Sequence, residues 1–346
     1  MPATSSPRVL PTHTPALFSE ACSQAVAVLK AGGVAALPTE TVYGLAANAL
    51  DPAAVSSIFQ IKGRPSHNPI IVHVSSLEMA RECASVWPPT ATRLAAAFWP
   101  GPLTLVLPRS AHIPDVVTAG GPTVGIRLPS HPFMRSVIEA CGFPLAAPSA
   151  NRSNEISPTT AAHCAKSLAG RVDCIIDGGN CQVGIESTVV DLSSGPMRVL
   201  RPGMISEDAL LAALGGPPAA GAQPTAPLGL SGPLRSPGLL ARHYAPRARL
   251  LVWRWDDEAA LRRQLEELER NVKGVRIMAH SRIPLGLGGS QVILVPCDPE
   301  AFARALYAEW HRCDDEGVGA IVVEEPPEGS DWDGIRDRLK RASTPA

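Results

Sequence analysis

The sequence predicts an α/β protein of two domains, a first of roughly 200 residues and a second that is smaller. The chain has 346 residues, which is longer than one hydrophobic core normally supports, and apolar residues make up 45% of it. The composition changes abruptly at residues 215–238, which are rich in Pro, Gly and Ala, have one charge and lack periodicity. After this segment a regular alternation of strands and helices begins.

The first part of the chain shows mixed helical and strand patterns. Ser19 is predicted to cap the first helix, which would end at Gly32, and Ser157 is predicted to cap a later helix whose first residue is Pro158. The predicted helices span residues 19–33, 51–63, 76–86, 131–142, 157–170 and 206–215. The predicted strands span residues 34–38, 68–74, 103–108, 123–129, 144–150, 172–179, 187–193 and 197–203.

The part after residue 247 is predicted to form a small parallel α/β domain of Rossmann-like layout, because strands and helices alternate there. Strands are expected at 249–255, 274–280, 291–296 and 318–326, and helices at 256–271, 298–317 and 330–343. The mixed charge of these helices is typical of solvated faces, and we assign this domain no chemistry. The expected organisation is a flexible tail over 1–15, a first domain over 16–212, a linker over 213–246 and a second domain over 247–346.

Bulk composition excludes several classes of protein. The formal net charge is −1, so any site for a polyanion must be a local patch. No apolar run reaches the roughly 18 residues that span a membrane, and the N-terminus has no apolar core of a secretory signal. The eight cysteines form no CxxC pair, so we expect free thiols in the reducing cytoplasm and no metal site.

A basic loop, KGRPSHN, separates the helix predicted over 51–63 from the strand predicted over 68–74. It carries Lys62 and Arg64, and His73 follows inside the strand. Cations on a loop at a strand edge suit a phosphate, with Arg as a fork and Lys as a point charge. A solvated basic loop is an equal alternative, and a histidine on a strand is more often part of the core.

Other strand ends and loops carry polar groups that suit the same ligand. The turn LPTETVYGL offers the Thr41 hydroxyl, and the serine-rich loop 147–161 precedes a predicted helix N-terminus, which favours phosphate. Arg127, Ser187 and Arg201 each lie at the end of an apolar strand. Turns and caps that bond their own backbone are the simpler reading of these loops. Walker A, kinase and GxSxG patterns are absent.

Taken together, these segments resemble one family. LPTETVYGL, KGRPSHNPIIVHV, WPGPLTLVL, TVGIRLPSHP, APSANRSNEISPTTA, GIESTVVDLS and LRPG are similar, in this order, to the motifs of the YrdC/TsaC family of threonylcarbamoyl-AMP synthases. The resemblance covers about residues 17–210, and SPGLLARHYAP with the following α/β part resembles the long, two-domain form. It implies a twisted, open, mixed sheet with helices and a basic concavity.

The resemblance also implies an activity and a site. Family members are nucleotidyltransferases that make threonylcarbamoyl-AMP and pyrophosphate from L-threonine, bicarbonate or CO2, and ATP, for the threonylcarbamoyladenosine at tRNA position 37. The implied threonine side comprises Thr41, His73, Arg127, Ala147 and Ser187. The implied ATP side comprises Lys62, Arg64, Asn68, Thr123, Ser149, Asn151, Ser157, Arg201 and Tyr244. Lys62, Arg64 and Arg201 are expected to neutralise charge during the reaction, with Mg²⁺ arriving on the ATP phosphates.

The sequence departs from the family pattern at two places. Asn154 replaces the usual glycine of the serine-rich loop, and we expect the turn to survive because Asn tolerates the left-handed region. Residues 239–241 replace the usual linker residues, and the linker is expected to cross and gate the site. Downstream tRNA threonylcarbamoyl-transfer machinery is the expected partner, weak RNA binding is a further expectation, and membrane association is not expected.

Two alternative functions remain open from the residues. One is a carbamoyl-adenylate former like those in hydrogenase maturation proteins, but their acylphosphatase and zinc-finger patterns are absent. The other is an RNA-binding module with a basic cleft, which should interleave aromatic residues with Lys and Arg. Aromatic residues make up only 4% of this chain, which disfavours base stacking.

Overall fold

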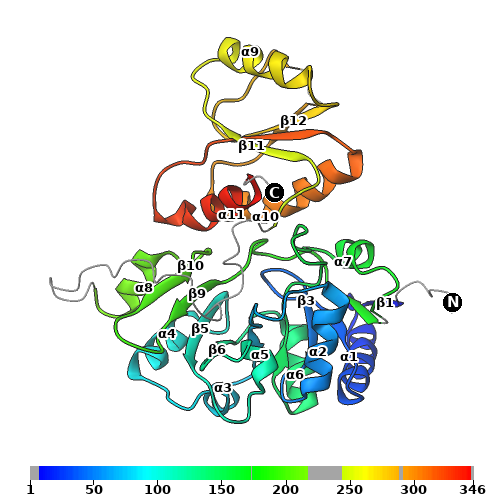
Figure 1. Ribbon diagram of the computed structural model, residues 1–346, viewed down its shortest axis with the longest axis vertical. Coiled ribbons are helices and arrows are strands. Elements are labelled where there is room, and N and C mark those ends of the chain that lie inside the picture. Colours follow the sequence, from blue (N-terminus) through cyan, green and yellow to red (C-terminus); the bar gives the residue numbers. More distant parts are fainter. Residues whose placement is uncertain (1–7, 173, 217–243, 288–290, 344–346) are drawn as a thin grey trace.

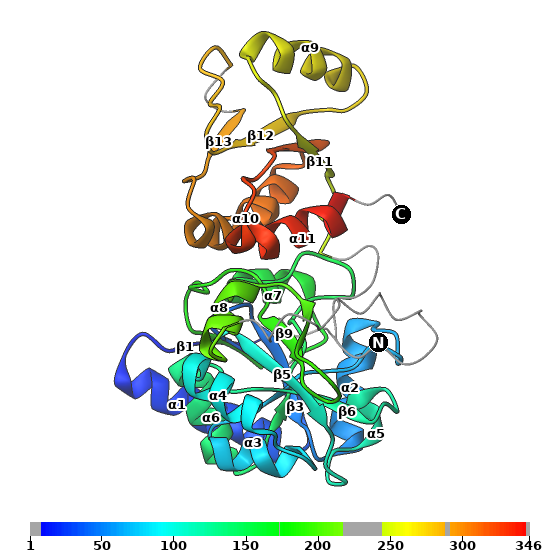
Figure 2. The same ribbon diagram turned by 90° about the vertical axis from the view of Figure 1, so that its left-hand side faces the viewer.

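A computed structural model describes residues 8–172, 174–216, 244–287 and 291–343. Figures 1 and 2 show two domains stacked along the long axis of the molecule, with helices α10 (Pro299–Glu316) and α11 (Asp333–Ser343) between the second sheet and the first domain. The linker predicted over 213–246 falls largely outside the described residues, as do the atypical residues 239–241, so its gating role stays a prediction.

The first domain is built on one mixed sheet. Within the described residues it has ten strands in the order β1-β8-β2-β3-β7-β4-β6-β5-β9-β10, with parallel and antiparallel pairs. The strands are β1 (Arg8–Pro11), β2 (Ala35–Leu37), β3 (Gly44–Asn48), β4 (Val72–His73), β5 (Leu103–Pro108), β6 (Thr123–Arg127), β7 (Leu145–Ala146), β8 (Cys174–Asp177), β9 (Thr188–Asp191) and β10 (Arg198–Arg201). The predicted mixed α/β architecture is confirmed.

Helices cover both faces of this sheet. Successive residues of a strand point to opposite faces, so Ala35 and Leu37 pack in the apolar cluster of α1 and α6, whereas Ala36 packs in the cluster of α2 and α4. The helices are α1 (Pro15–Lys30), α2 (Pro52–Lys62), α3 (Leu77–Cys83), α4 (Pro89–Phe98), α5 (Asp115–Thr118), α6 (Pro132–Cys141), α7 (Ala161–Ser167) and α8 (Glu207–Ala213).

Helix α2 has clear start and stop signals, and these position the basic loop. The Asp51 carboxylate accepts hydrogen bonds from the backbone N–H groups of Ala53 (2.9 Å) and Ala54 (3.3 Å). Gly63 ends the helix in the left-handed conformation, with φ of 60°. Lys62 therefore closes the helix, and Arg64 begins the return toward the sheet.

Three sequence-based expectations about local structure are wrong. Residues 8–11 are not part of a loose tail, because β1 pairs in parallel with β8. The first helix begins at Pro15, and its cap is Thr14, five residues before the predicted cap Ser19. The helix predicted from Ser157 begins instead after Thr160, whose hydroxyl accepts from the His163 backbone N–H.

The second domain is a small parallel α/β unit, as predicted. Within the described residues its sheet has the order β11-β14-β12-β13, and all three strand pairs are parallel. Its strands are β11 (Arg249–Trp253), β12 (Val275–Ala279), β13 (Val292–Leu294) and β14 (Ala320–Glu324). Helix α9 (Glu258–Glu269) covers one face, and α10 and α11 cover the other, with a 3-10 turn at Ser330–Trp332.

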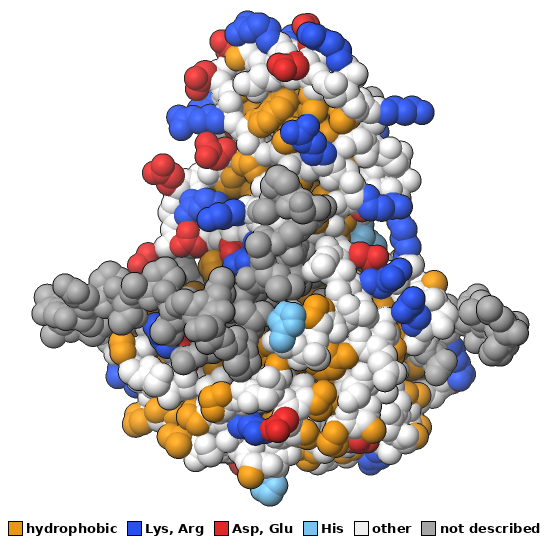
Figure 3. All heavy atoms as spheres, viewed as in Figure 1, with side chains coloured by type: hydrophobic (Ala, Val, Ile, Leu, Met, Phe, Trp, Pro, Cys, Tyr) orange, Lys and Arg blue, Asp and Glu red, His pale blue; other side chains and the backbone are white. Residues whose placement is uncertain are grey.

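The surface of the second domain carries both signs of charge, as its sequence indicates. Figure 3 shows positive and negative side chains around an apolar area on the face in view. Across the part of the chain that is described, no helix has both the length and the apolar character needed to cross a membrane.

Candidate active site

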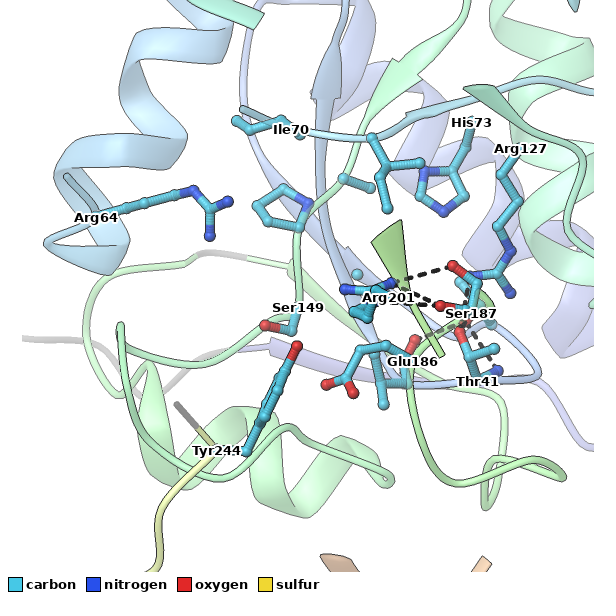
Figure 4. A pocket seen from close by; sticks show the side chains of 16 residues that line it. Thr41, Arg64, Ile70, His73, Arg127, Ser149, Glu186, Ser187, Arg201 and Tyr244 are labelled. Atoms are coloured by element: carbon cyan, nitrogen blue, oxygen red, sulfur yellow. Dashed lines mark hydrogen bonds between the residues drawn. The ribbon is translucent and has the colours of Figure 1, made fainter. Parts of the chain in front are cut away.

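A pocket opens in the first domain, where strand ends and loops bring polar side chains together. Its lining combines three arginines with hydroxyl groups and a short apolar wall. The lining residues are Thr39, Thr41, Val42, Gly44, Arg64, Ile70, Ile71, His73, Arg127, Ala147, Pro148, Ser149, Glu186, Ser187, Arg201 and Tyr244. Figure 4 shows Arg64, Ser149 and Tyr244 at one end, His73, Arg127 and Thr41 at the other, and Arg201 between them.

At one end of the pocket, a buried ion pair fixes Arg127, the last residue of β6. Its Nη2 atom lies 2.7 Å from Oε1 of Glu40, and its Nη1 atom donates to the Thr41 hydroxyl at 2.8 Å. Burial opposes ionisation of Glu40, but Arg127 outweighs it and holds the pKa of Glu40 below its ordinary value. The guanidinium is thus pre-oriented to meet a small anionic group such as a carboxylate.

His73 forms the wall beside Arg127, because β4 pairs in parallel with β6 and places the two residues opposite each other. The side chain is 3% exposed. Burial and the positive charge of Arg127 lower the pKa of His73 to about 3, so the imidazole is neutral at pH 7. The His73 side chain lines the pocket.

The other cationic groups come from the basic loop and from β10. Arg64 donates from Nε to the Asn68 carbonyl (3.1 Å) and from Nη2 to the Pro69 carbonyl (2.7 Å), so the loop itself holds the guanidinium at the pocket. Arg201 donates from Nε and Nη2 to the Ser187 carbonyl at 3.1 and 3.0 Å, and from Nη2 to its hydroxyl at 3.2 Å. Two separated arginines of this kind suit a polyphosphate.

Lys62 lies beneath the pocket and does not line it. Its side chain is 2% exposed, and Nζ donates to the Ser149 carbonyl (2.6 Å), the Asn151 carbonyl (2.5 Å) and Asn151 Oδ1 (3.1 Å). Burial and the nearby Arg64 lower the pKa of Lys62, while the three oxygen acceptors match the three protons of an ammonium group. In this arrangement Lys62 shapes the serine-rich loop.

The loop that Lys62 holds keeps its expected turn. Asn154 has φ of 70°, so the residue that replaces the family's glycine does adopt the left-handed conformation, as predicted. The Ser149 hydroxyl donates to Asn151 Oδ1 at 2.6 Å, and Asn151 Nδ2 donates to the carbonyls of Glu155 (2.8 Å) and Ile156 (3.1 Å). Asn151 therefore supports the loop, whereas Ser149 lines the pocket.

Of the residues named from the sequence, the pocket gathers nine and leaves five outside its lining. The nine are Thr41, Arg64, His73, Arg127, Ala147, Ser149, Ser187, Arg201 and Tyr244. Lys62 and Asn151 lie beneath it, and Asn68 presents its carbonyl to Arg64. Thr123 lines a smaller neighbouring hollow that shares Ile70 and Ile71 with the pocket. Ser157 is fully buried and donates to Glu186 Oε1 at 2.5 Å.

Glu186 is the main site residue that sequence reasoning missed. It lines the pocket, and only its neighbour Ser187 was singled out from the sequence. The available signal was a carboxylate directly before the hydroxyl residues of a predicted strand. Its partners include Arg338 of the second domain, which no local pattern indicates.

The described residues contain no group of three or more His, Cys, Asp or Glu side chains placed to hold a metal ion. Glu186, the carboxylate that lines the pocket, has both oxygens engaged, by Ser157 on one and by Tyr307 and Arg338 on the other. The pocket therefore fits a metal ion that arrives with its own phosphate ligands better than one held by protein side chains alone.

Comparisons with known proteins show the family of this chain. A family model for Sua5, YciO and YrdC proteins, described as "Telomere recombination", matches residues 27–203, and a model described as "Threonylcarbamoyl-AMP synthase, C-terminal domain" matches residues 205–344. The threonylcarbamoyl-AMP synthase of Pyrococcus abyssi is 39% identical over 92% of this chain and 93% of its own length. That of Bacillus subtilis is 36% identical over 93% and 92%.

A solved structure gives the same result for the fold. The crystal structure of P. abyssi Sua5 complexed with L-threonine superposes with a TM-score of 0.83 and 37% identity, covering 97% of this chain and 96% of that one. Both domains of the present chain are therefore matched. The chain belongs to the threonylcarbamoyl-AMP synthase family, in the form that carries the additional C-terminal domain.

Proposed function

We propose that this chain makes threonylcarbamoyl-AMP and pyrophosphate from L-threonine, bicarbonate or CO2, and ATP, in the pocket described above. The observation that carries the proposal is the separation of the pocket into two cationic ends, one at Arg127 and one at Arg64, with Arg201 between them. Such a site can hold an amino-acid carboxylate and a polyphosphate at once. The relatives named threonylcarbamoyl-AMP synthase support this reading over an RNA-binding module.

The threonine end is assigned to Arg127, His73, Thr41, Ala147 and Ser187. Arg127, held by Glu40, binds the carboxylate as a fork. The neutral imidazole of His73 lines the pocket beside Arg127 and is assigned to the wall that holds the amino acid. The P. abyssi Sua5 structure is a complex with L-threonine, which supports threonine as the ligand.

The chemical steps need positioning more than acid–base catalysis. The threonine amine attacks CO2, forms an N–C bond and loses a proton, which gives a carbamate. A carbamate oxygen then attacks the α-phosphorus of ATP in line, the new P–O bond forms, and the bond to the bridging oxygen breaks with release of pyrophosphate. The carbamate is already an anion, so the site mainly has to align the reactants and neutralise phosphate charge.

The ATP end is assigned to Arg64, Arg201, Ser149 and Tyr244 as lining groups. Lys62 and Asn151 act there by fixing the loop that carries Ser149, and Asn68 acts by fixing Arg64. Ser157 acts through Glu186, and Thr123 bounds the adjoining hollow. Magnesium bound to ATP would supply further charge neutralisation at the phosphates. Its ligands would be phosphate oxygens and water, because the pocket carboxylate Glu186 is engaged by protein donors.

The lability of the product and the free cysteine thiols favour an enzyme that works in the cytoplasm, close to the proteins that use its product. A mixed anhydride of a carbamate and AMP is hydrolysed readily, so a threonylcarbamoyl-transfer machinery for tRNA must take it up nearby. The eight cysteines are thiols rather than disulfides, which suits the reducing cytoplasm. Weak contact with RNA is a further part of the proposal.

The experiment is a product assay with purified protein. ATP, Mg²⁺, threonine and bicarbonate are incubated with it, and threonylcarbamoyl-AMP is sought by mass spectrometry alongside pyrophosphate release. We expect both products to depend on threonine and on bicarbonate. Pyrophosphate release with serine but not with threonine would overturn the substrate assignment, and absence of any adduct would overturn the reaction.

A further inference from the structure

Two side chains of the second domain reach the wall of the pocket. Arg338 of α11 donates from Nε to Glu186 Oε2 at 2.8 Å and from Nη2 to the Glu186 carbonyl at 3.1 Å. The hydroxyl of Tyr307 on α10 donates to the same carboxylate oxygen at 3.0 Å. Arg338 and Tyr307 are fully buried, and Figure 1 shows their helices on the side of the second domain that faces the first. Arg338 and Tyr307 of the second domain thus hold Glu186, which lines the pocket, by hydrogen bonds.

Arg338 also contacts the segments that carry two other lining residues. Its Nη1 atom donates to the carbonyl of Pro202 at 2.9 Å, directly after Arg201 in the chain. Its guanidinium lies 5.2 Å from the ring centroid of Tyr244, within the range of a cation–π interaction. One buried side chain therefore ties together three segments of the pocket wall.

The ion pair between Arg338 and Glu186 also affects Arg201, the cationic residue at the centre of the pocket. Burial alone would raise the pKa of Glu186, but Arg338 and then Arg201 lower it to about 2, so the carboxylate is charged at neutral pH. A buried carboxylate without Arg338 would have to draw its compensation from Arg201. Arg201 would then be pulled from Ser187 toward Glu186, away from the position that suits a phosphate.

We propose that Arg338 and Tyr307 are positioning residues of the active site, which hold Glu186 so that Arg201 remains directed to the ATP phosphates. The second domain is then a working part of the catalytic pocket, and its contribution acts on ATP more than on threonine, because Arg127 and His73 lie at the other end. This inference rests on the proposed function. A contact that merely joins the domains would alter stability without this selectivity.

The test uses the full-length chain with Arg338→Met, Arg338→Lys and Tyr307→Phe, with steady-state kinetics for both substrates and thermal melts. Arg336→Gln is the matched control, because Arg336 is on the same helix and its hydrogen bonds to described residues all lie within the second domain. We expect Arg338→Met to lower kcat/KM for ATP by about 10- to 100-fold, as misplaced groups typically do. The KM for threonine should stay within about twofold of the control.

A double variant separates positioning from simple loss of stability. Removing the uncompensated charge by Glu186→Gln in the Arg338→Met background should return most of the affinity for ATP, because nothing then competes for Arg201. Tyr307→Phe, which removes one hydroxyl and keeps the ring, should lower kcat/KM for ATP by about threefold to tenfold, the effect of one typical hydrogen bond.

Two results would overturn the inference. One is a folded Arg338→Met protein whose ATP kinetics match those of the Arg336→Gln control. The other is equal loss toward threonine and ATP in every variant, with no recovery in the double variant, which would indicate a structural role only. If the unaltered chain makes no threonylcarbamoyl-AMP, the proposed function itself fails, and the two failures are thus distinguishable.

Discussion

Replacing Lys62 by Met provides a strong test of how the site is built. The ammonium group lies beneath the pocket and donates to three oxygens of the loop that carries Ser149 and Asn151, at 2.5 to 3.1 Å. Methionine has a similar length and no donor. The change therefore leaves two carbonyls and one side-chain amide oxygen without this partner in a buried place, while the apolar contacts of the side chain remain.

The expected loss of stability follows from two opposing terms. Each buried acceptor that loses its only donor costs about 1–3 kcal/mol, so the two carbonyls would together cost about 2–6 kcal/mol, whereas Asn151 Oδ1 keeps the Ser149 hydroxyl as a donor. Methionine avoids the burial of a charge, which offsets part of this cost. A net loss of about 1–3 kcal/mol remains, and for a domain of roughly 200 residues this lowers Tm by about 2 to 12 °C.

The measurement is a thermal melt of the protein without added substrates, compared with Lys30→Met. Lys30 is exposed at the end of α1, and its replacement should change the free energy of unfolding by no more than about 0.5 kcal/mol. Turnover should fall together with stability, because Ser149 lies on the released loop.

An unchanged or higher Tm in Lys62→Met would refute this reasoning. Removal of an unpaired buried charge should stabilise a protein. That outcome would mean that Lys62 is a direct phosphate ligand whose charge is compensated only when ATP is bound.

Three further predictions concern other parts of the molecule. The rings of His163 and His311 stack with their centroids 3.7 Å apart between the domains, and burial lowers their pKa values to about 3 and about 4. Below about pH 6.5 the unfolded chain therefore binds more protons than the folded chain, so the free energy of unfolding should fall as the pH drops from 6.5 toward 4, by roughly 1–2 kcal/mol per histidine at pH 5. Thermal melts at several pH values measure this loss, and His311→Gln should make it smaller. Arg127→Lys loses the fork geometry and should raise KM for threonine by about tenfold, with little change for ATP, in initial-rate assays. Gly203→Ala should cost about 3 kcal/mol or more and reduce turnover strongly, because the new Cβ would lie 2.5 Å from the Thr188 backbone nitrogen.

Each of these predictions has an outcome that contradicts it. A stability profile that is flat between pH 7 and pH 5 would show that the histidine pair does not titrate as described. Equal increases in both KM values would remove Arg127 from the threonine end. For Gly203, the control is Gly142→Ala. At Gly142 φ is 76°, and an added Cβ would meet no atom of the described residues within 4 Å apart from its chain neighbours, so only about 1–2 kcal/mol of backbone strain is expected. Equal effects of the two alanines would exclude a steric cause.

Local patterns predicted most elements, and their failures have physical causes. Strand β3 was not predicted, because Gly44–Asn48 consists mainly of small residues and becomes a strand through pairing with β2 and β7. Helix α4 begins at Pro89, directly after Pro88, and was missed, although a proline is tolerated in the first turn of a helix. The strand predicted over 68–74 shrinks to β4, because the Arg64 side chain takes the Asn68 and Pro69 carbonyls.

The sequence by itself determined the two α/β domains, the family, and the segments whose cations and hydroxyls form the pocket, because these depend on periodicity, turn residues and ordered motifs within short stretches. Tertiary structure alone decided what each polar group bonds. Lys62 bonds a loop almost ninety positions away, and Arg338 bonds Glu186 across 152 positions. The partner of a buried charge is whichever group the fold brings within hydrogen-bonding distance, and no local pattern records that distance.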